Sequence, residues 1–356
     1  MSHTCPLEGI RIVDLSRLLP GPLTTLLLSD LGAEVIRVED PAGSDYLRSM
    51  PPLCPDGMGK LFHALNRGKK SVTIDLKSDT GHQQFLDLVT KADVVVENFR
   101  PGVMAKLKIA PQTILEQFPH VVVCSISGFG QTGSAASHAG HDLNFVARTG
   151  ILGAMRTPVP LPIQVGDICG GAWPAVAQIL AALLARQKSG MGTCLDISMS
   201  HNVAAMMMVR AAGSTDYLQG DVPCYSIYET KDGHYAVAAI EPKFWNELIA
   251  VLGLPDLANC GLSTGEEGAG VQSRIAEAFA QKTNAEWQAI FDPLNICVDP
   301  VCLTTGPFQS TVALDIGDEE TALPIWPLAA DLASPKMQRA PYLGEHNAVF
   351  LKQRSP

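Results

Sequence analysis

The chain has 356 residues, of which 46% are hydrophobic and 17% are charged. This length and composition predict a soluble globular protein with a large core and two domains. A formal net charge of -10 argues against a nucleic acid partner, because binding to phosphates requires a surplus of Lys and Arg. An anionic ligand therefore has to be held by a local cluster of basic residues.

The nine cysteines include no C-x-x-C pair and no zinc-type spacing, which indicates reduced thiols, a cytoplasmic protein and no bound metal. The N-terminus, MSHTCPLEGIRIVDLS, lacks the basic and then apolar pattern of a signal peptide. No apolar run is expected to reach the length of a membrane span, so we expect no membrane partner.

The first half of the chain alternates strand-like and helix-like segments, as βαβ units do. Strands are expected at residues 10–16, 33–40, 70–76, 92–99 and 120–130, and helices at 22–32, 80–92 and 111–117. Short apolar strands that each return through a helix predict an α/β domain with a parallel sheet covered on both faces.

A long apolar helix is expected after Gly171, with Pro174 in its first turn and Gly190 at its end. The segment CLDISMS predicts a strand, and Ser200 is expected to cap the helix that follows. The methionines at 206–208 are expected to pack in a core rather than to form a ligand surface.

The pattern changes near residue 221. YSIYETKDGHYAVAAI predicts two strands joined by a tight turn, followed by three helical segments with the Gly-rich stretch EEGAG between them. We expect a large domain over 1–200, a linker helix over 201–220, a smaller α+β domain over 221–325, and a C-terminal segment, 326–356, that returns to the large domain.

Three residues are candidates for chemistry. His141, in HAGHDLNFVA, could transfer a proton near neutral pH, although a hydrogen-bonded structural histidine is the commoner case. Asp167, in VGDICGGAWP, could cap a helix or face a ligand with a raised pKa. Glu241, in YAVAAIEPKFW, could point to water or orient a histidine.

A basic cluster lies in NRGKKSVTIDLK, with Arg100 in ENFRPG after the next expected strand. A solvated surface explains such residues by default. Ligands of open α/β sheets, however, bind at the carboxyl ends of strands, where these loops lie, so a nucleotide phosphate site is the functional alternative.

Taken together, these segments resemble CoA-transferase family III, which includes α-methylacyl-CoA racemases. The likeness runs over nearly the whole chain, through LEGIRIVDLSRLLPGP, LLSDLGAEVIRVEDPAGSDYLR, NRGKKSVTIDLK, ADVVVENFRPGV, SISGFGQTG, GHDLNF, VGDICGG, IEPKFW and APYLGEH. The resemblance implies a Rossmann-like large domain, a small domain, an interlocked ring-like homodimer, an acyl-CoA thioester as substrate and no separate cofactor.

In this family the aspartate that matches Asp167 carries the acyl group in transferases and moves the α-proton in racemases. GHDLNF and IEPKF look like racemase blocks, so the resemblance implies that Glu241 supports His141. It therefore implies a racemase or epimerase of 2-methylacyl-CoA thioesters, working through an enolate with His141 and Asp167 as the two acid/bases. A CoA-transferase and a catalytically silent binder of CoA thioesters remain alternatives.

The resemblance also implies a set of residues around the CoA moiety, namely Arg37, Asp75, Lys77, Asn98, Arg100, Lys106, Gly140, Asp142 and Asn144. Amides near Gly170 and Gly171 are expected to stabilise the enolate. Two positions depart from the family pattern. Asp40 stands where an arginine for the CoA phosphates is usual, and Asn295 replaces an acid in NICVDPV. The phosphates are then expected to bind Arg37, Lys77, Arg100 and Lys106.

Overall fold

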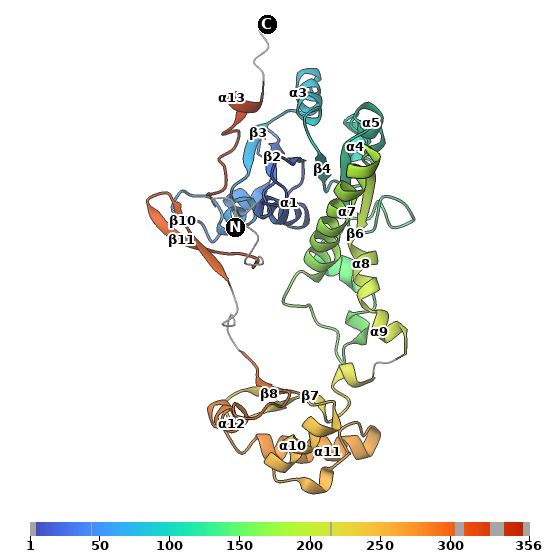
Figure 1. The fold of residues 1–356 in the computed structure, drawn as a ribbon, viewed down its shortest axis with the longest axis vertical. Coiled ribbons are helices and arrows are strands. Elements are labelled where there is room, and N and C mark those ends of the chain that lie inside the picture. The colour runs from blue at the N-terminus through green and yellow to red at the C-terminus, as the bar shows by residue number, and fades with distance from the viewer. Residues whose placement is uncertain (1–4, 44, 214–215, 303–309, 328–337, 352–356) are drawn as a thin grey trace. The chain divides into compact units, whose positions relative to one another are not determined.

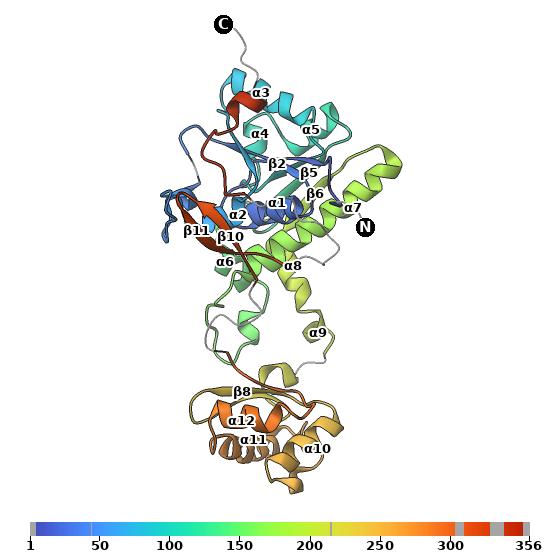
Figure 2. The ribbon, with the colours of Figure 1, turned by 60° about the vertical axis from the view of Figure 1, so that its left-hand side comes forward.

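The computed structural model describes residues 5–43, 45–213, 216–302, 310–327 and 338–351. The chain divides into two compact units, shown in Figure 1 and, from another side, in Figure 2. The first unit comprises Met1–Leu152, Val159–Met207 and Ser310–Pro356, and the second comprises Gly153–Pro158 and Met208–Gln309.

The first unit is built on a six-stranded parallel sheet with the order β3-β2-β1-β4-β5-β6. This is the strand order of the Rossmann fold, so the expected α/β class is confirmed. The strands are β1 (Arg11–Asp14), β2 (Glu34–Glu39), β3 (Lys70–Thr73), β4 (Val94–Glu97), β5 (Val122–Ser127) and β6 (Cys194–Ser198).

Helices cover both faces of this sheet, because successive strand residues point to opposite sides and both sides are apolar. Side chains such as Val94 and Val96 pack against one set of helices, and Val95 packs against the other. The first set is α1 (Pro20–Asp30), α2 (Lys60–Asn66) and α7 (Trp173–Ser189). The second is α3 (Asp79–Val89), α4 (Val103–Lys106) and α5 (Pro111–Gln117).

Residues 166–189 form one continuous helical stretch of 24 residues that contains an 18-residue window with a mean hydropathy of 1.7, long and apolar enough by composition to cross a membrane. The expectation that no apolar run reaches that length is therefore wrong. Its apolar side nevertheless packs in the core of the first unit, where Val176, Ile179 and Leu183 are buried. Gly190 ends the helix with φ of 70°, as expected.

Two expectations around the next helix are corrected. α8 (Met199–Met206) is capped by Ser198, whose hydroxyl accepts a hydrogen bond from the His201 N–H, and not by Ser200. Ser200 instead donates to the Phe145 carbonyl at 3.1 Å. The methionine run is not core in the single chain, because Met206 and Met208 are 46% and 70% exposed.

The second unit is a small α+β fold with its own core. A three-stranded antiparallel sheet, β7 (Tyr225–Glu229), β8 (His234–Ala238) and β9 (Val298–Pro300), packs against α10 (Pro242–Val251), α11 (Gly265–Phe279) and α12 (Asn284–Phe291). Aromatic rings fill the interface, with Phe279 stacked on Tyr228 and Tyr235. The stretch EEGAG lies inside α11 and not between helices. Its two glutamates stabilise the first turn of α11, because negative side chains interact favourably with the positive N-terminal end of a helix.

The hairpin of β10 (Thr311–Ile316) and β11 (Glu319–Pro324) lies in the first unit, although its residues were expected in the small domain. Its buried Leu314, Ile316 and Leu323 pack with Cys54, which explains this allocation. The chain then runs along β3, where Gly344 donates to the Ser71 hydroxyl at 2.9 Å, before it forms α13 (Asn347–Phe350).

Gly170 lets α8 approach the first turns of the long helical stretch closely. A Cβ atom at this position would lie 2.5 Å from the Met199 carbonyl oxygen and 2.7 Å from a Val203 methyl. We expect Gly170→Ala to lower the free energy of unfolding by about 1–3 kcal/mol because backbone must shift, measured by urea denaturation. Gly270→Ala is the matched control: it adds a methyl into open space within α11 and should not destabilise.

Candidate functional site

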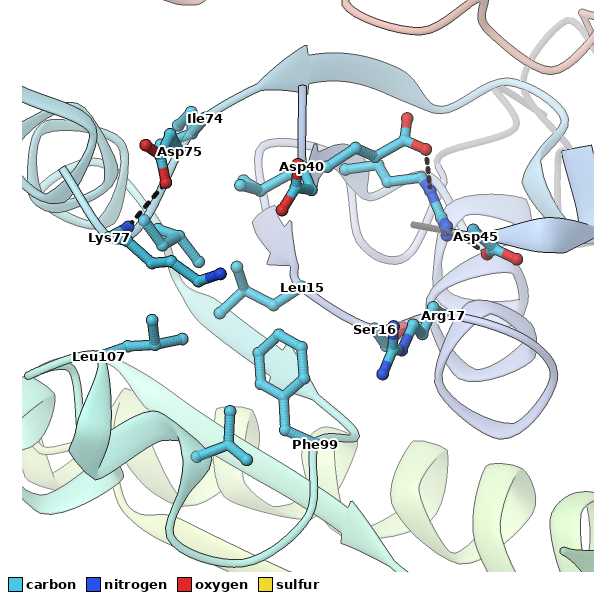
Figure 3. A pocket seen from close by; sticks show the side chains of 15 residues that line it. Leu15, Ser16, Arg17, Asp40, Asp45, Ile74, Asp75, Lys77, Phe99 and Leu107 are labelled. Carbon is cyan, nitrogen blue, oxygen red and sulfur yellow. Dashed lines mark hydrogen bonds and ion pairs between the residues drawn. The ribbon is translucent and has the colours of Figure 1, made fainter. Parts of the chain in front are cut away.

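A cavity lies at the carboxyl ends of the central strands of the first unit, where the strand order reverses between β1 and β4. Open α/β sheets bind their ligands at this switch point. The cavity has a volume of about 210 Å³, and Figure 3 shows the side chains around it. Its polar lining comes from the loops after β1, β2 and β3, and includes Arg17, Asp40, Asp75 and Lys77.

The loop after β1 is held by Asp14, which is completely buried. Its carboxylate accepts hydrogen bonds from the Ser16 amide at 2.8 Å, from the Ser16 hydroxyl and from the Thr25 hydroxyl at 2.6 Å, and it pairs with the Lys69 ammonium at 3.3 Å. Burial opposes ionisation, but the charges of Lys69 and Arg37 hold the pKa of Asp14 below its usual range. Asp14 is therefore a charged structural residue beneath the cavity.

The loop after β4 is tied to the loop after β1 by Asn98. The Arg17 amide donates to Asn98 Oδ1 at 3.0 Å, and Asn98 Nδ2 donates to the Arg17 carbonyl at 2.8 Å. Asn98 was predicted to contact CoA, and the structure uses its amide to join the two loops at the switch point. The same loop carries Phe99, whose amide donates to the Glu97 carboxylate at 2.7 Å and whose ring lines the cavity.

Arg37 was predicted to bind a phosphate, but its side chain is buried and already ion-paired. It is 1% exposed, and its guanidinium pairs with Asp45 at 2.5 Å and Glu39 at 3.3 Å and donates to Asn66 at 3.0 Å. Because these partners enclose the guanidinium, Arg37 is a structural cation at the wall of the cavity rather than a free phosphate donor.

Besides Arg37, the cationic side chains that line the cavity are Lys77 and Arg17. Lys77 was predicted to bind a phosphate, and this role stays a prediction. Arg17 was not among the predicted residues. The position of Arg17 three residues after β1, at the strand end that borders the switch point, is the signal that would have found it. Arg100 and Lys106 are exposed near α4, outside the lining of this cavity. Asp75 lines the cavity, and its carboxylate accepts a hydrogen bond from the Lys77 amide at 3.0 Å.

A second group of predicted residues meets where α6 (Asp142–Ala147) packs against a π-helix over Gly166–Ala172. The Asp167 amide donates to Asp142 Oδ1 at 2.9 Å, and the His141 amide donates to Asn144 Oδ1 at 3.1 Å. A Cβ atom on Gly166 would lie 2.9 Å from the same Asp142 oxygen, so a glycine is needed there. One short contact thus joins the segments that carry His141 and Asp167.

Gly140 has a comparable role at the start of α6, since a Cβ atom there would lie 2.7 Å from the Phe145 ring. Gly170 and Gly171 are buried against Met199 of α8, and the Asn202 amide donates to the Gly170 carbonyl at 2.8 Å. Close packing therefore requires glycine at these positions, and the role of their amides at an oxyanion stays a prediction.

The environment of Asp167 suits it to proton transfer. Burial, and next the negative charge of Asp142, raise the pKa of Asp167 to about 7. The carboxyl group is then divided between its two protonation states near neutral pH, as general acid/base catalysis requires. It also lies in a π-helical segment, a geometry that occurs often at functional sites.

Glu241 lies in the second unit, where it is exposed directly before α10. Its predicted support of His141 stays a prediction. Asn295 is also exposed in that unit, shortly before β9. Within the described parts of the chain, no three His, Cys, Asp or Glu side chains come together as a set of metal ligands.

Comparisons with known proteins agree on one family. A family model described as CoA-transferase family III matches residues 7–347. Alpha-methylacyl-CoA racemase from Homo sapiens is 34% identical over 373 residues, which cover 98% of this chain and 93% of that protein. Succinyl-CoA:glutarate CoA-transferase from Mus musculus is 31% identical over 98% of this chain and 86% of its own length.

Solved structures show the same fold. The crystal structure of Rv3272 from Mycobacterium tuberculosis matches with a TM-score of 0.84 and 28% identity, covering 98% of this chain and 99% of that one. A CAIB/BAIF family protein from Brucella suis matches with a TM-score of 0.80 and 27% identity over 96% and 97% of the two chains. Both racemases and transferases are therefore among the relatives.

Proposed function

Because the chain belongs to CoA-transferase family III, whose enzymes act on CoA thioesters, we propose that it is a racemase or epimerase of 2-methylacyl-CoA thioesters. The observation that carries the proposal is the contact between Asp142 and the Asp167 amide, which joins the segment that begins with His141 to the π-helix with Asp167. Inversion at a carbon through an enolate needs one acid/base group for each face of the substrate, and we assign these two roles to His141 and Asp167.

In the proposed reaction, one of the two groups removes the α-proton, and the pair of electrons from the broken C–H bond forms the enolate of the thioester. The other group then donates a proton to the opposite face. The two groups end in exchanged protonation states, and return to their original states by exchange with water. A carboxyl group with a pKa of about 7 can serve in either direction, which a reversible racemisation requires.

A CoA-transferase is the second candidate, because Asp167 matches the acyl-carrying residue of that branch and transferases are among the relatives. In that reaction the carboxylate attacks the thioester and releases the CoA thiolate. Both reactions use the ionised carboxylate in one step, but only proton transfer also uses the protonated form, which a pKa of about 7 keeps populated.

The two reactions are separated by incubating the full-length protein with a 2-methylacyl-CoA in D2O. We expect deuterium to enter the α-carbon while the thioester stays intact. A transferase would instead leave the α-hydrogen in place, consume an added carboxylic acid and yield an Asp167 acyl adduct that hydroxylamine traps. Binding without either reaction, over short, branched and steroid side-chain thioesters, would indicate a silent binder.

The pH dependence of exchange tests the role of Asp142. The kcat/KM of the free enzyme is expected to change near pH 7 as Asp167 titrates. Asp142→Asn keeps an oxygen for the Asp167 amide but removes a negative charge, so the pKa of Asp167 should fall and the inflection should move to lower pH. An unchanged inflection in this variant would contradict the electrostatic role of Asp142.

We further propose that the protein acts in the cytoplasm as an interlocked homodimer, with Glu241 orienting the imidazole of His141. The exposed Met206 and Met208 support the dimer, since a partner chain would cover apolar side chains that the single chain leaves in water. Light scattering coupled to size exclusion should give twice the chain mass of 37.9 kDa. A mass that stays at one chain would rule the dimer out.

A further inference from the structure

Asp40 gives the cavity at the switch point an unusual charge. It follows β2 directly, lines the cavity, and points its carboxylate inward, as Figure 3 shows. One carboxylate oxygen accepts the Ala42 amide at 2.8 Å. Over the described part of the chain, no basic side chain forms an ion pair with Asp40. The carboxylate is therefore free to receive a hydrogen bond from a ligand.

The neighbouring acids are neutralised, and Asp40 is not. Glu39 pairs with Arg48 at 2.6 Å and Arg37 at 3.3 Å, and Asp45 pairs with Arg37 at 2.5 Å. Besides the ion-paired Arg37, the cations in the cavity lining are Arg17 and Lys77, which come from the loops after β1 and β3. The end of β2 consequently presents a negative charge, while the strands on both sides of it contribute the positive ones.

This placement has a chemical meaning in sheets with this strand order. An acid after the second strand accepts hydrogen bonds from ribose hydroxyls, whereas an arginine nearby accommodates a phosphate on the ribose. A phosphate close to an uncompensated carboxylate is repelled, and at a separation of a few ångströms beside the exposed Asp40 this repulsion amounts to roughly a tenfold loss of affinity.

We propose that Asp40 accepts a hydrogen bond from a ribose hydroxyl of the bound nucleotide and disfavours a phosphate on that ribose. The inference rests on the proposed use of a CoA thioester and specifies its nucleotide part. The cavity then binds 3′-dephospho-CoA at least as tightly as CoA, with the pyrophosphate left to Arg17 and Lys77.

The test measures binding alone, so that it does not depend on which reaction the enzyme catalyses. The full-length protein is titrated calorimetrically with CoA and with 3′-dephospho-CoA, and the ratio of the two Kd values is compared with those of Asp40→Asn and Asp40→Arg. Glu116→Gln removes the same charge on the exposed surface of α5 and serves as the control. Thermal melts establish that each variant is folded.

We expect the wild-type protein to bind CoA no more tightly than 3′-dephospho-CoA. In both Asp40 variants the Kd of 3′-dephospho-CoA divided by the Kd of CoA should be about tenfold higher than in the wild-type protein. The control should keep the wild-type ratio. A wild-type preference for CoA, an unchanged ratio in Asp40→Asn, or no binding of either nucleotide would each overturn the proposal. The deuterium exchange assay reports separately on the proposed function.

Discussion

Asp167→Asn is expected to lower the rate of α-hydrogen exchange at least about a thousandfold, because an amide neither takes up nor releases the proton at neutral pH. The asparagine has nearly the same shape, and the hydrogen bond from the backbone amide of residue 167 to Asp142 is independent of the side chain. The Kd for the thioester should therefore stay within a small factor of the wild-type value. The measurement is deuterium incorporation by mass spectrometry, together with calorimetric binding of an unreactive thioester.

His141→Ala separates the two candidate reactions in the same assay. It should reduce exchange strongly in a racemase, whereas a transferase that uses Asp167 alone should tolerate the change. His138→Ala is the matched control, because His138 is another exposed histidine three residues upstream, with its Nδ1 close to Arg148 at 3.0 Å.

If Asp167→Asn retained more than about a tenth of the exchange rate, proton transfer by this carboxyl group would have to be abandoned.

The sequence predicted the sheet of the first unit well, because five consecutive strands are short apolar runs separated by helical segments. Strands that are buried on both faces of a parallel sheet are typically such continuous apolar runs. The same pattern could not show that the hairpin of β10 and β11 packs on Cys54 in the first unit, since that contact joins residues more than 250 positions apart. The sequence pattern also did not place EEGAG in a helix. Its glycines have a low helix propensity, and this signal outweighed the two glutamates that favour the first turn of a helix.

The candidate site was predictable to a similar degree. His141, Asp142 and Asp167 stand out as polar residues in apolar surroundings, and the structure brings Asp142 and Asp167 into contact. The role of Arg37 was not predictable, because its partner Asp45 lies in a loop and Asn66 lies at the end of a helix 29 residues later in the chain. Basic residues in a sequence thus do not reveal which of them are already neutralised inside the protein.

A buried group of charged residues next to the cavity shows how a basic side chain is neutralised inside the protein. Lys69 has its ammonium enclosed by Asp14, Thr25, Asn66 and the Pro22 carbonyl, at distances between 2.8 and 3.3 Å. Burial lowers the pKa of Lys69 to about 8, although the charge of Asp14 opposes that change. A buried ion is tolerated only while its partner and its hydrogen bonds are complete, so the loss of one member leaves an uncompensated charge.

Asp14→Ala is accordingly expected to lower the free energy of unfolding by about 3–5 kcal/mol, because it leaves Lys69 without its carboxylate and removes the acceptor of Ser16 and Thr25. Urea denaturation monitored by circular dichroism measures the change.

Asp14→Asn divides the effect of Asp14→Ala into its parts, since it keeps an oxygen for the hydroxyl groups and loses only the charge. The free energy of unfolding of Asp14→Asn should lie between the values of the wild-type protein and Asp14→Ala. The control is Asp256→Ala, which removes the acid of the exposed ion pair with Arg274 and should scarcely move the midpoint, because water screens that pair. If Asp14→Ala behaved like this surface variant, the buried charges would not be what stabilises the loop beneath the cavity, and the position of Ser16 and Arg17 would need another explanation.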